Sequence, residues 1–237
     1  MLESFALTDT GCVRPNNEDY CFVDSRIGLY VLADGMGGAK AGEQASRMAV
    51  DALVDVLRGS PSRDSQALLK AVEEANQRVM DAADADPLLE GMGTTLVAAL
   101  EVGEELSIAS VGDSRAYVLD DAGFRLITQD QTWINDVGRP LGLDEDSLRN
   151  HPMRHVLTMA IGVGASLAIN YYVVRLKPSA QLLLCSDGLH GVAEPEQIEE
   201  ILRDCGDNLE RKCRRLIEAA REAGGPDNIT VVLIRAS

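Results

Sequence analysis

The feature that most limits the possible folds is a short apolar segment that runs directly into Asp-Gly, which occurs twice. Residues 31–35 read Val-Leu-Ala-Asp-Gly, and residues 183–188 read Leu-Leu-Cys-Ser-Asp-Gly. A third aspartate, Asp113, follows another apolar run, and a fourth, Asp227, precedes one. Short apolar runs bounded by turn residues are typical of buried strands. The pattern therefore predicts a strand-rich fold with four aspartates at strand ends.

Carboxylates gathered at one edge of a sheet would repel each other unless a cation neutralised them. Carboxylate, carbonyl and water oxygens are the ligands that Mg²⁺ and Mn²⁺ favour, and no matching His/Cys cluster suggests zinc or copper. A single Asp-Gly after a strand is usually only a turn. The pattern alone leaves both interpretations open, four separate turns or one shared metal site.

The remaining elements follow from apolar spacing. Apolar residues three or four apart predict helices over 45–57, 68–83, 196–203 and 209–220. The predicted strands are residues 20–24, 29–33, 94–100, 106–111, 115–119, 124–127, 168–176, 181–186 and 229–234. We expect those between 94 and 127 to form an antiparallel meander. Residues 130–155 predict a short helix and a mobile surface segment.

Composition excludes several classes of protein. The net charge of −16 disfavours binding to nucleic acid or to anionic membranes. No apolar run is long enough to span a membrane, and the first ten residues lack the pattern of a signal peptide. Five cysteines without a CxxC pair predict reduced thiols rather than a disulfide framework. We expect a cytoplasmic protein without membrane insertion.

A further polar segment, residues 14–19, reads Arg-Pro-Asn-Asn-Glu-Asp and precedes a predicted strand. It is interpretable as a solvated turn. Alternatively, Arg14 binds a phosphate through its planar guanidinium, and Glu18 and Asp19 orient metal-bound water.

Six segments, in order along the chain, resemble the metal-dependent protein phosphatases of type 2C, the PPM family, in its compact bacterial form. They are residues 14–19, 34–38, 91–95, 111–115, 185–188 and 225–230. Each is weak alone, but the ordered set is specific. The resemblance implies an α+β fold, a four-layer α-β-β-α sandwich of two mainly antiparallel sheets flanked by helix pairs. It also implies that residues 1–237 form one phosphatase domain, with a short variable flap at about 131–155.

The resemblance implies two to three Mn²⁺ or Mg²⁺ ions and their ligands. Asp34 would bridge two ions, and the Gly35 carbonyl would bind one of them. Asp187 and Asp227 would complete the second site. Asp113, together with Asp187, would hold the third ion found in bacterial members.

Other residues would act around the ions. Glu18 and Asp19 would contact metal-bound water, and Asn228 would brace Asp227. Arg14 would bind the phosphate of the substrate.

The implied activity is the hydrolysis of phosphoserine and phosphothreonine in proteins by a metal-activated water. A water that bridges two ions ~3.5–4 Å apart loses its proton near neutral pH and attacks phosphorus directly. No covalent phosphoenzyme is needed.

The chain departs from the family pattern at two positions. Met36 stands where many eukaryotic members have a histidine that is a candidate general acid, so the leaving alkoxide would take its proton from a metal-bound water. Gln131 stands where a histidine is common, which affects substrate contacts more than the metal site.

Four other residues outside these segments invite a functional reading. His151 and His155 are four apart, but Pro152 argues against a helix that would make them a ligand pair. We expect His190 to be packed or solvated near the site, and Trp133 to anchor the flap.

Two alternatives concern the function. The first is a catalytically silent binding or scaffold protein with the same fold, although all the expected aspartates are present. The second keeps the same chemistry but has a different protein substrate, because some relatives dephosphorylate anti-sigma-factor antagonists. Those usually carry sensor domains, so a monomer that opposes a bacterial Ser/Thr kinase is the simpler expectation.

Overall fold

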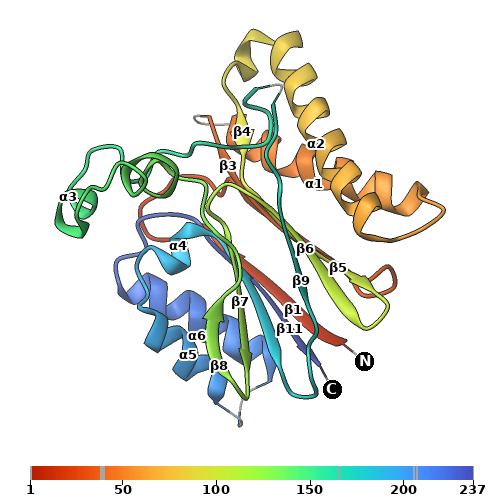
Figure 1. Cartoon of the computed structure of the whole chain (residues 1–237), viewed down its shortest axis with the longest axis vertical. Helices are drawn as coiled ribbons and strands as arrows, with labels where there is room; N and C mark the ends of the chain where they lie inside the picture. Colours follow the sequence, from red (N-terminus) through yellow and green to blue (C-terminus); the bar gives the residue numbers. More distant parts are fainter. Residues whose placement is uncertain (1, 38–40, 165, 205, 207, 237) are drawn as a thin grey trace.

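The computed structural model describes residues 2–37, 41–164, 166–204, 206 and 208–236. Gly38 of the segment 34–38 and Cys205 therefore lie outside the described residues. Two antiparallel sheets pack face to face, and a pair of helices covers the outer face of each (Figure 1). The predicted four-layer α-β-β-α sandwich is confirmed.

The five-stranded sheet has the order β1 (Leu2–Asp9), β11 (Ile229–Ala236), β10 (Gln181–Cys185), β7 (Arg115–Asp120), β8 (Gly123–Leu126). The other sheet has the order β2 (Asp19–Asp24), β3 (Leu29–Met36), β5 (Leu96–Val102), β6 (Glu105–Val111), β9 (Asn170–Val174), with the short β4 (Gly93–Thr94) paired to β3.

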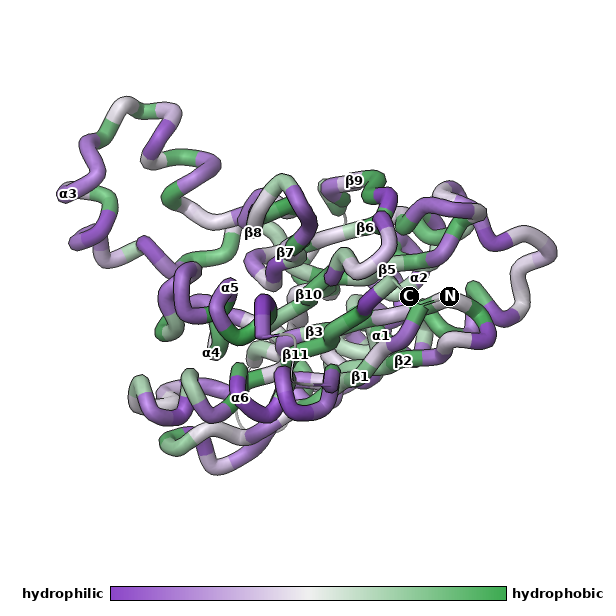
Figure 2. Tube along the Cα trace, turned by 90° about the horizontal axis from the view of Figure 1, so that it is seen from below, coloured by the Kyte–Doolittle hydropathy of each residue, from purple (hydrophilic) through white to green (hydrophobic). Residues whose placement is uncertain are grey.

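Central strands are buried on both faces, which explains why they appear in the sequence as continuous apolar runs. In β10, Leu182 and Leu184 point into the layer between the two sheets. Leu183 and Cys185 point the other way, toward the outer helices. Figure 2 shows the same division, with hydrophobic central strands and mainly hydrophilic residues along α6.

The longer helices lie where the periodicity predicts them. α1 (Ala41–Gly59) and α2 (Ser65–Ala85) pack on the sheet that contains β3, and α5 (Pro195–Arg203) and α6 (Leu209–Glu222) on the other sheet. The shorter helices are η1 (Pro87–Leu89), η2 (Ile134–Gly138), α3 (Glu145–Arg149) and α4 (Asp187–His190). In the described part of the chain, no helix combines the length and apolar character needed to cross a membrane.

The expected meander over residues 94–127 is wrong. β5 and β6 form a hairpin in one sheet, whereas β7 and β8 form a hairpin in the other. The chain changes sheets at Gly112, whose φ of 93° is a left-handed conformation that favours glycine. A Cβ at Gly112 would also lie 2.8 Å from the Thr95 side chain. This crossing carries Asp113 to the edge between the sheets.

Two further differences concern the ends and the flap. β1 is not among the predicted strands, and it pairs with β11 over its full length, from Leu2 opposite Ala236 to Asp9 opposite Ile229. The flap contains two short helical segments, η2 and α3, instead of one, and the loop with α3 projects from the body of the molecule (Figures 1 and 2).

The packing between the sheets predicts a large cost for shortening Leu182. Its side chain is fully buried there, so Leu182→Ala removes apolar contacts and leaves a cavity. We expect a loss of about 2–5 kcal/mol in the free energy of unfolding, measured by urea denaturation. Leu88→Ala is the matched control, since Leu88 is 87% exposed, and should change the value by about 0.5 kcal/mol or less.

Candidate metal centre

The four aspartates that the sequence places at strand ends line one cavity of about 670 Å³. Asp34 lies near the end of β3 and Asp113 follows β6. Asp187 begins α4 directly after β10, and Asp227 lies just before β11. Arg14, Glu18, Gly35 and Asn228 line the same cavity. The structure thus brings together in one place residues as far apart in the chain as Arg14 and Asn228.

Strand pairing sets the position of Asp34. It lies opposite Asp19 in the antiparallel pair β2–β3, and its backbone N–H donates to Thr95 Oγ1 over 3.1 Å. The next residue, Gly35, lies against the start of α1, where a Cβ would come within 2.1 Å of the Gly42 carbonyl oxygen. Only glycine allows the chain to pass this close, so its carbonyl can stand at the cavity wall.

Asp19 lies behind this wall and is buried. Its Oδ2 accepts a hydrogen bond of 2.8 Å from the Ser186 hydroxyl. Its Oδ1, like Oδ1 of Asp187, is buried without a hydrogen-bond partner among the described residues. A buried carboxylate oxygen without a partner is costly in free energy, and a bound cation would supply the missing interaction.

The electrostatics of the cavity agree with this interpretation. Burial raises the pKa of Asp19 and of Asp113 to about 7. Burial and then the neighbouring Asp19 raise the pKa of Asp34 well above its ordinary value. For Asp187, burial and then Asp227 raise the pKa. Asp34, Asp113 and Asp187 line the cavity and Asp19 lies behind its wall, so a divalent cation bound there would offset the cost of ionising these groups.

The donor set suits a hard cation. Among the described residues, no three His, Cys, Asp or Glu side chains converge as a complete ligand group. Mg²⁺ sites commonly use one or two carboxylates per ion and fill the other positions with water. Carboxylates spread around a solvent-accessible cavity fit that mode of coordination, in which each ion takes few protein ligands.

Arg14 and Asn228 tie the loop before β2 to the segment before β11. Arg14 Nη2 donates to Asp227 Oδ2 over 2.7 Å, which leaves the guanidinium at the cavity wall. The Asn228 backbone N–H donates to Asp227 Oδ1 over 2.9 Å. The Asn228 side chain instead holds the loop: Oδ1 accepts from the Glu18 backbone, and Nδ2 donates to the Asn16 carbonyl. Asn228 therefore contacts Asp227 through its backbone and positions Glu18 through its amide.

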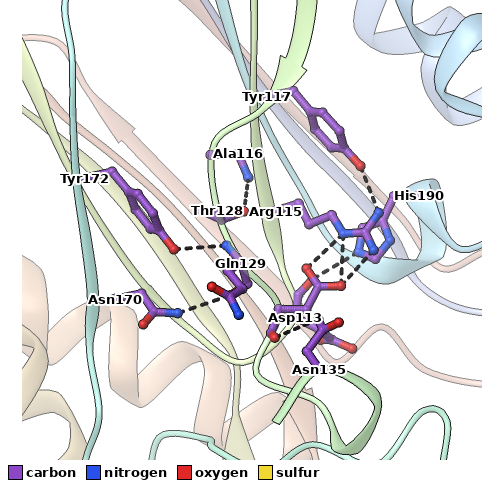
Figure 3. Close-up of polar contacts among 11 residues, drawn as sticks. Asp113, Arg115, Ala116, Tyr117, Thr128, Gln129, Asn135, Asn170, Tyr172 and His190 are labelled. Atoms are coloured by element: carbon purple, nitrogen blue, oxygen red, sulfur yellow. Dashed lines mark hydrogen bonds and ion pairs between the residues drawn. The ribbon is translucent and has the colours of Figure 1, made fainter. Parts of the chain in front are cut away.

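His190 lies beside Asp113 and contacts its backbone (Figure 3). Its Nε2 lies 3.0 Å from the Asp113 carbonyl oxygen, and because a carbonyl only accepts, Nε2 carries the hydrogen. Burial lowers the pKa of His190 to about 4, so the ring is neutral at pH 7. His190 is thus a packed residue that holds the backbone of Asp113.

The flap contributes to the cavity wall His155, for which the sequence argued against a ligand role, and Val156 and Leu157, which the sequence did not single out. His155, Val156 and Leu157 line the cavity, although no helix forms around Pro152. His151 faces Trp133 within the flap, with ring centroids 3.9 Å apart and planes at 7°. Trp133 therefore packs inside the flap as predicted. No motif marks residues 155–157, because their place depends on how the flap folds back.

Comparisons with known proteins agree with this geometry. The family model for protein phosphatase 2C matches residues 14–223. The serine/threonine phosphatase stp of Listeria innocua is 36% identical over 235 residues, which cover 96% of this chain and 93% of that protein.

Solved structures give the same assignment. The crystal structure of the Mycobacterium tuberculosis serine/threonine phosphatase PstP/Ppp superposes with a TM-score of 0.90 at 35% identity, over 100% of this chain and 99% of that one. The catalytic domain of PstP in complex with two manganese ions has a TM-score of 0.86 at 35% identity, over 99% and 97% of the two chains. The chain therefore belongs to the protein phosphatase 2C family, in the form found in bacterial serine/threonine phosphatases.

Proposed function

We propose that this chain hydrolyses phosphoserine and phosphothreonine in proteins and depends on two to three Mn²⁺ or Mg²⁺ ions. The observation that carries the proposal is that Asp34, Asp113, Asp187 and Asp227 all line one cavity, with a carboxylate oxygen of Asp187 left buried and unpartnered among the described residues. Asp34, Asp187 and Asp227 would hold two ions with the Gly35 carbonyl, and Asp113 with Asp187 a third. When bound, such ions acidify a coordinated water and offset charge on the phosphoryl group.

The residues of the chain prepare the cavity for a phosphate group. Arg14 places a guanidinium beside Asp227 and would bind phosphoryl oxygens through paired hydrogen bonds. Glu18, positioned by Asn228, would hold water at the metal centre. Asp19 is fixed by Ser186 and would do the same from behind the cavity wall. Met36 lines the cavity beside Asp34, so no imidazole at that position donates a proton to the leaving group.

The wider setting of the enzyme is part of the proposal. Its substrates are phosphorylated proteins, and the simplest partner is a Ser/Thr kinase whose action it reverses. We propose that the chain acts in the cytoplasm and as a monomer. The four cysteines that the structure describes are free thiols, which suits a reducing compartment. Residues 1–237 would act as one catalytic domain, and the family match over residues 14–223 supports this.

Replacement of one ligand tests the metal mechanism. Asp187→Asn keeps the shape of the side chain and removes its charge, so we expect kcat for p-nitrophenyl phosphate with Mn²⁺ to fall by about a hundredfold or more. Asp84→Asn, at an exposed position of α2, should leave kcat unchanged. If the metallated wild type releases no phosphate from any phosphopeptide, the silent scaffold is the better account.

Metal removal should make stability depend on pH in a defined direction. Without metal, the raised pKa of about 7 for Asp19 and Asp113 means that the folded chain holds more protons than the unfolded chain. The free energy of unfolding therefore decreases as pH rises from about 4 to about 7. His190 acts in the opposite sense, and so do carboxyls with a lowered pKa such as Asp24, but the stability that these carboxyls contribute is lost mainly below about pH 4, outside this range.

We expect the Tm in EDTA to be lower at about pH 8 than at about pH 5, and Mn²⁺ to raise it most at about pH 8. Scanning calorimetry measures both effects, and Asp113→Asn should reduce the dependence on pH. Turnover that persists in EDTA, or a Tm that does not change when Mn²⁺ is added, would contradict the metal centre.

A further inference from the structure

The flap forms one wall of the metal cavity through His155, Val156 and Leu157. His155 and Val156 are exposed to solvent, so they are available for contact. A phosphorylated side chain that enters the cavity brings the polypeptide around it to the cavity rim, of which residues 155–157 are one part. The placement of residues 155–157 therefore matters for protein substrates, beyond the phosphate itself.

This wall is held by the flap root, which we define as residues 130–133. The Trp133 N–H donates to the Val156 carbonyl over 2.8 Å, and the Thr158 N–H donates to the Gln131 carbonyl over 3.0 Å. Thr132 and Leu157 face each other as an antiparallel bridge between these hydrogen bonds. Because the pairing is through the backbone, residues 155–157 follow any movement of the flap root.

Gln131 joins the flap root to the turn that carries Asp113. Its backbone N–H donates to the Gly112 carbonyl over 2.9 Å, and its Oε1 accepts from the Gly112 N–H over 2.8 Å. Its Nε2 donates to the Ala168 carbonyl over 2.8 Å. Both the oxygen and the nitrogen of the Gln131 side-chain amide are thus hydrogen-bonded. The flap root and the turn at Gly112 therefore move together.

Asp130 supplies the charged part of the same anchor, and its partner Arg115 is labelled in Figure 3. Arg115, on β7, donates to both carboxylate oxygens of Asp130, with Nε–Oδ1 at 2.9 Å and Nη2–Oδ2 at 2.7 Å. The side chains are only 25% and 12% exposed. A paired, half-buried contact of this kind is stronger than a surface ion pair. Asn135 of η2 then donates to the Asp130 carbonyl over 3.0 Å, which extends the anchor into the flap.

We propose that Asp130 is a positioning residue for protein substrates: through Arg115 it fixes the flap root, and with it residues 155–157, at one place beside Asp113. The proposal rests on the proposed function, because it concerns how a phosphoprotein is held for that reaction. A small aryl phosphate needs the cavity and little of the wall. Loosening the anchor should therefore affect phosphoproteins more than small substrates.

The chain offers a matched control for this anchor. Asp120, at the far end of β7, accepts paired hydrogen bonds of 2.8 and 2.9 Å from Arg125 on β8. Asp120→Asn and Asp130→Asn are thus the same change in the same kind of ion pair. Asp120 is not among the residues that line the metal cavity.

The experiment compares both variants on phosphorylated casein and on p-nitrophenyl phosphate, with saturating Mn²⁺. For Asp130→Asn we expect KM for casein to rise about tenfold, from the loss of one charged hydrogen-bonded pair, and KM for p-nitrophenyl phosphate to change about twofold or less. Amide hydrogen exchange in residues 139–158 should be faster in Asp130→Asn. Asp120→Asn should match the wild type in each measurement.

Equal effects on both substrates, unchanged hydrogen exchange in the flap, or the same behaviour in Asp120→Asn would overturn the proposal. If Asp130→Asn does not fold, Asn135→Ala gives a second test, since it removes the link to the Asp130 carbonyl and leaves the ion pair in place. If the wild type hydrolyses neither substrate, the proposed function fails, whereas the exchange measurement still decides whether Asp130 holds the flap.

Discussion

Repulsion among buried carboxylates is the constraint on which this structure depends. The sandwich ends at an edge where Asp19, Asp34, Asp113 and Asp187 have raised pKa values, because burial penalises their charge. A fold that only maximised its own stability would not gather these groups. The rest of the molecule supplies the free energy that holds them there: three apolar layers, one between the sheets and one under each helix pair.

The sheets also give the site its shape. Each aspartate lies at or near the end of a different strand, and close contacts fix the chain beside two of them. At Gly112 the chain leaves one sheet for the other, and at Gly35 it passes within contact of α1. Rigid strand ends keep the oxygens in place without ligands on long loops. The flap alone is attached to this frame from outside, through Asp130 and Gln131.

Sequence patterns predicted the parts of the molecule that local chemistry determines. The helices follow from apolar spacing, and the four aspartates from their places at the ends of apolar runs, two of them in strand–Asp-Gly motifs. β1 could not be predicted in this way, because its partner β11 lies more than two hundred residues away. The split of residues 94–127 between two sheets depends on one left-handed glycine. Residues 155–157 carry no motif, since pairing with the flap root alone brings them to the cavity.

The pairing of the first strand with the last has a consequence for anything joined to this domain. Leu2 lies opposite Ala236, so the two ends of the described chain leave the sandwich side by side (Figure 1). β11 has eight residues and starts beside Asp227, so its far end stands roughly 25 Å from the cavity. A short peptide could join the two ends and allow new termini at the exposed 121–122 turn. A tag or neighbouring domain fused at either end would leave the cavity mouth open to large substrates.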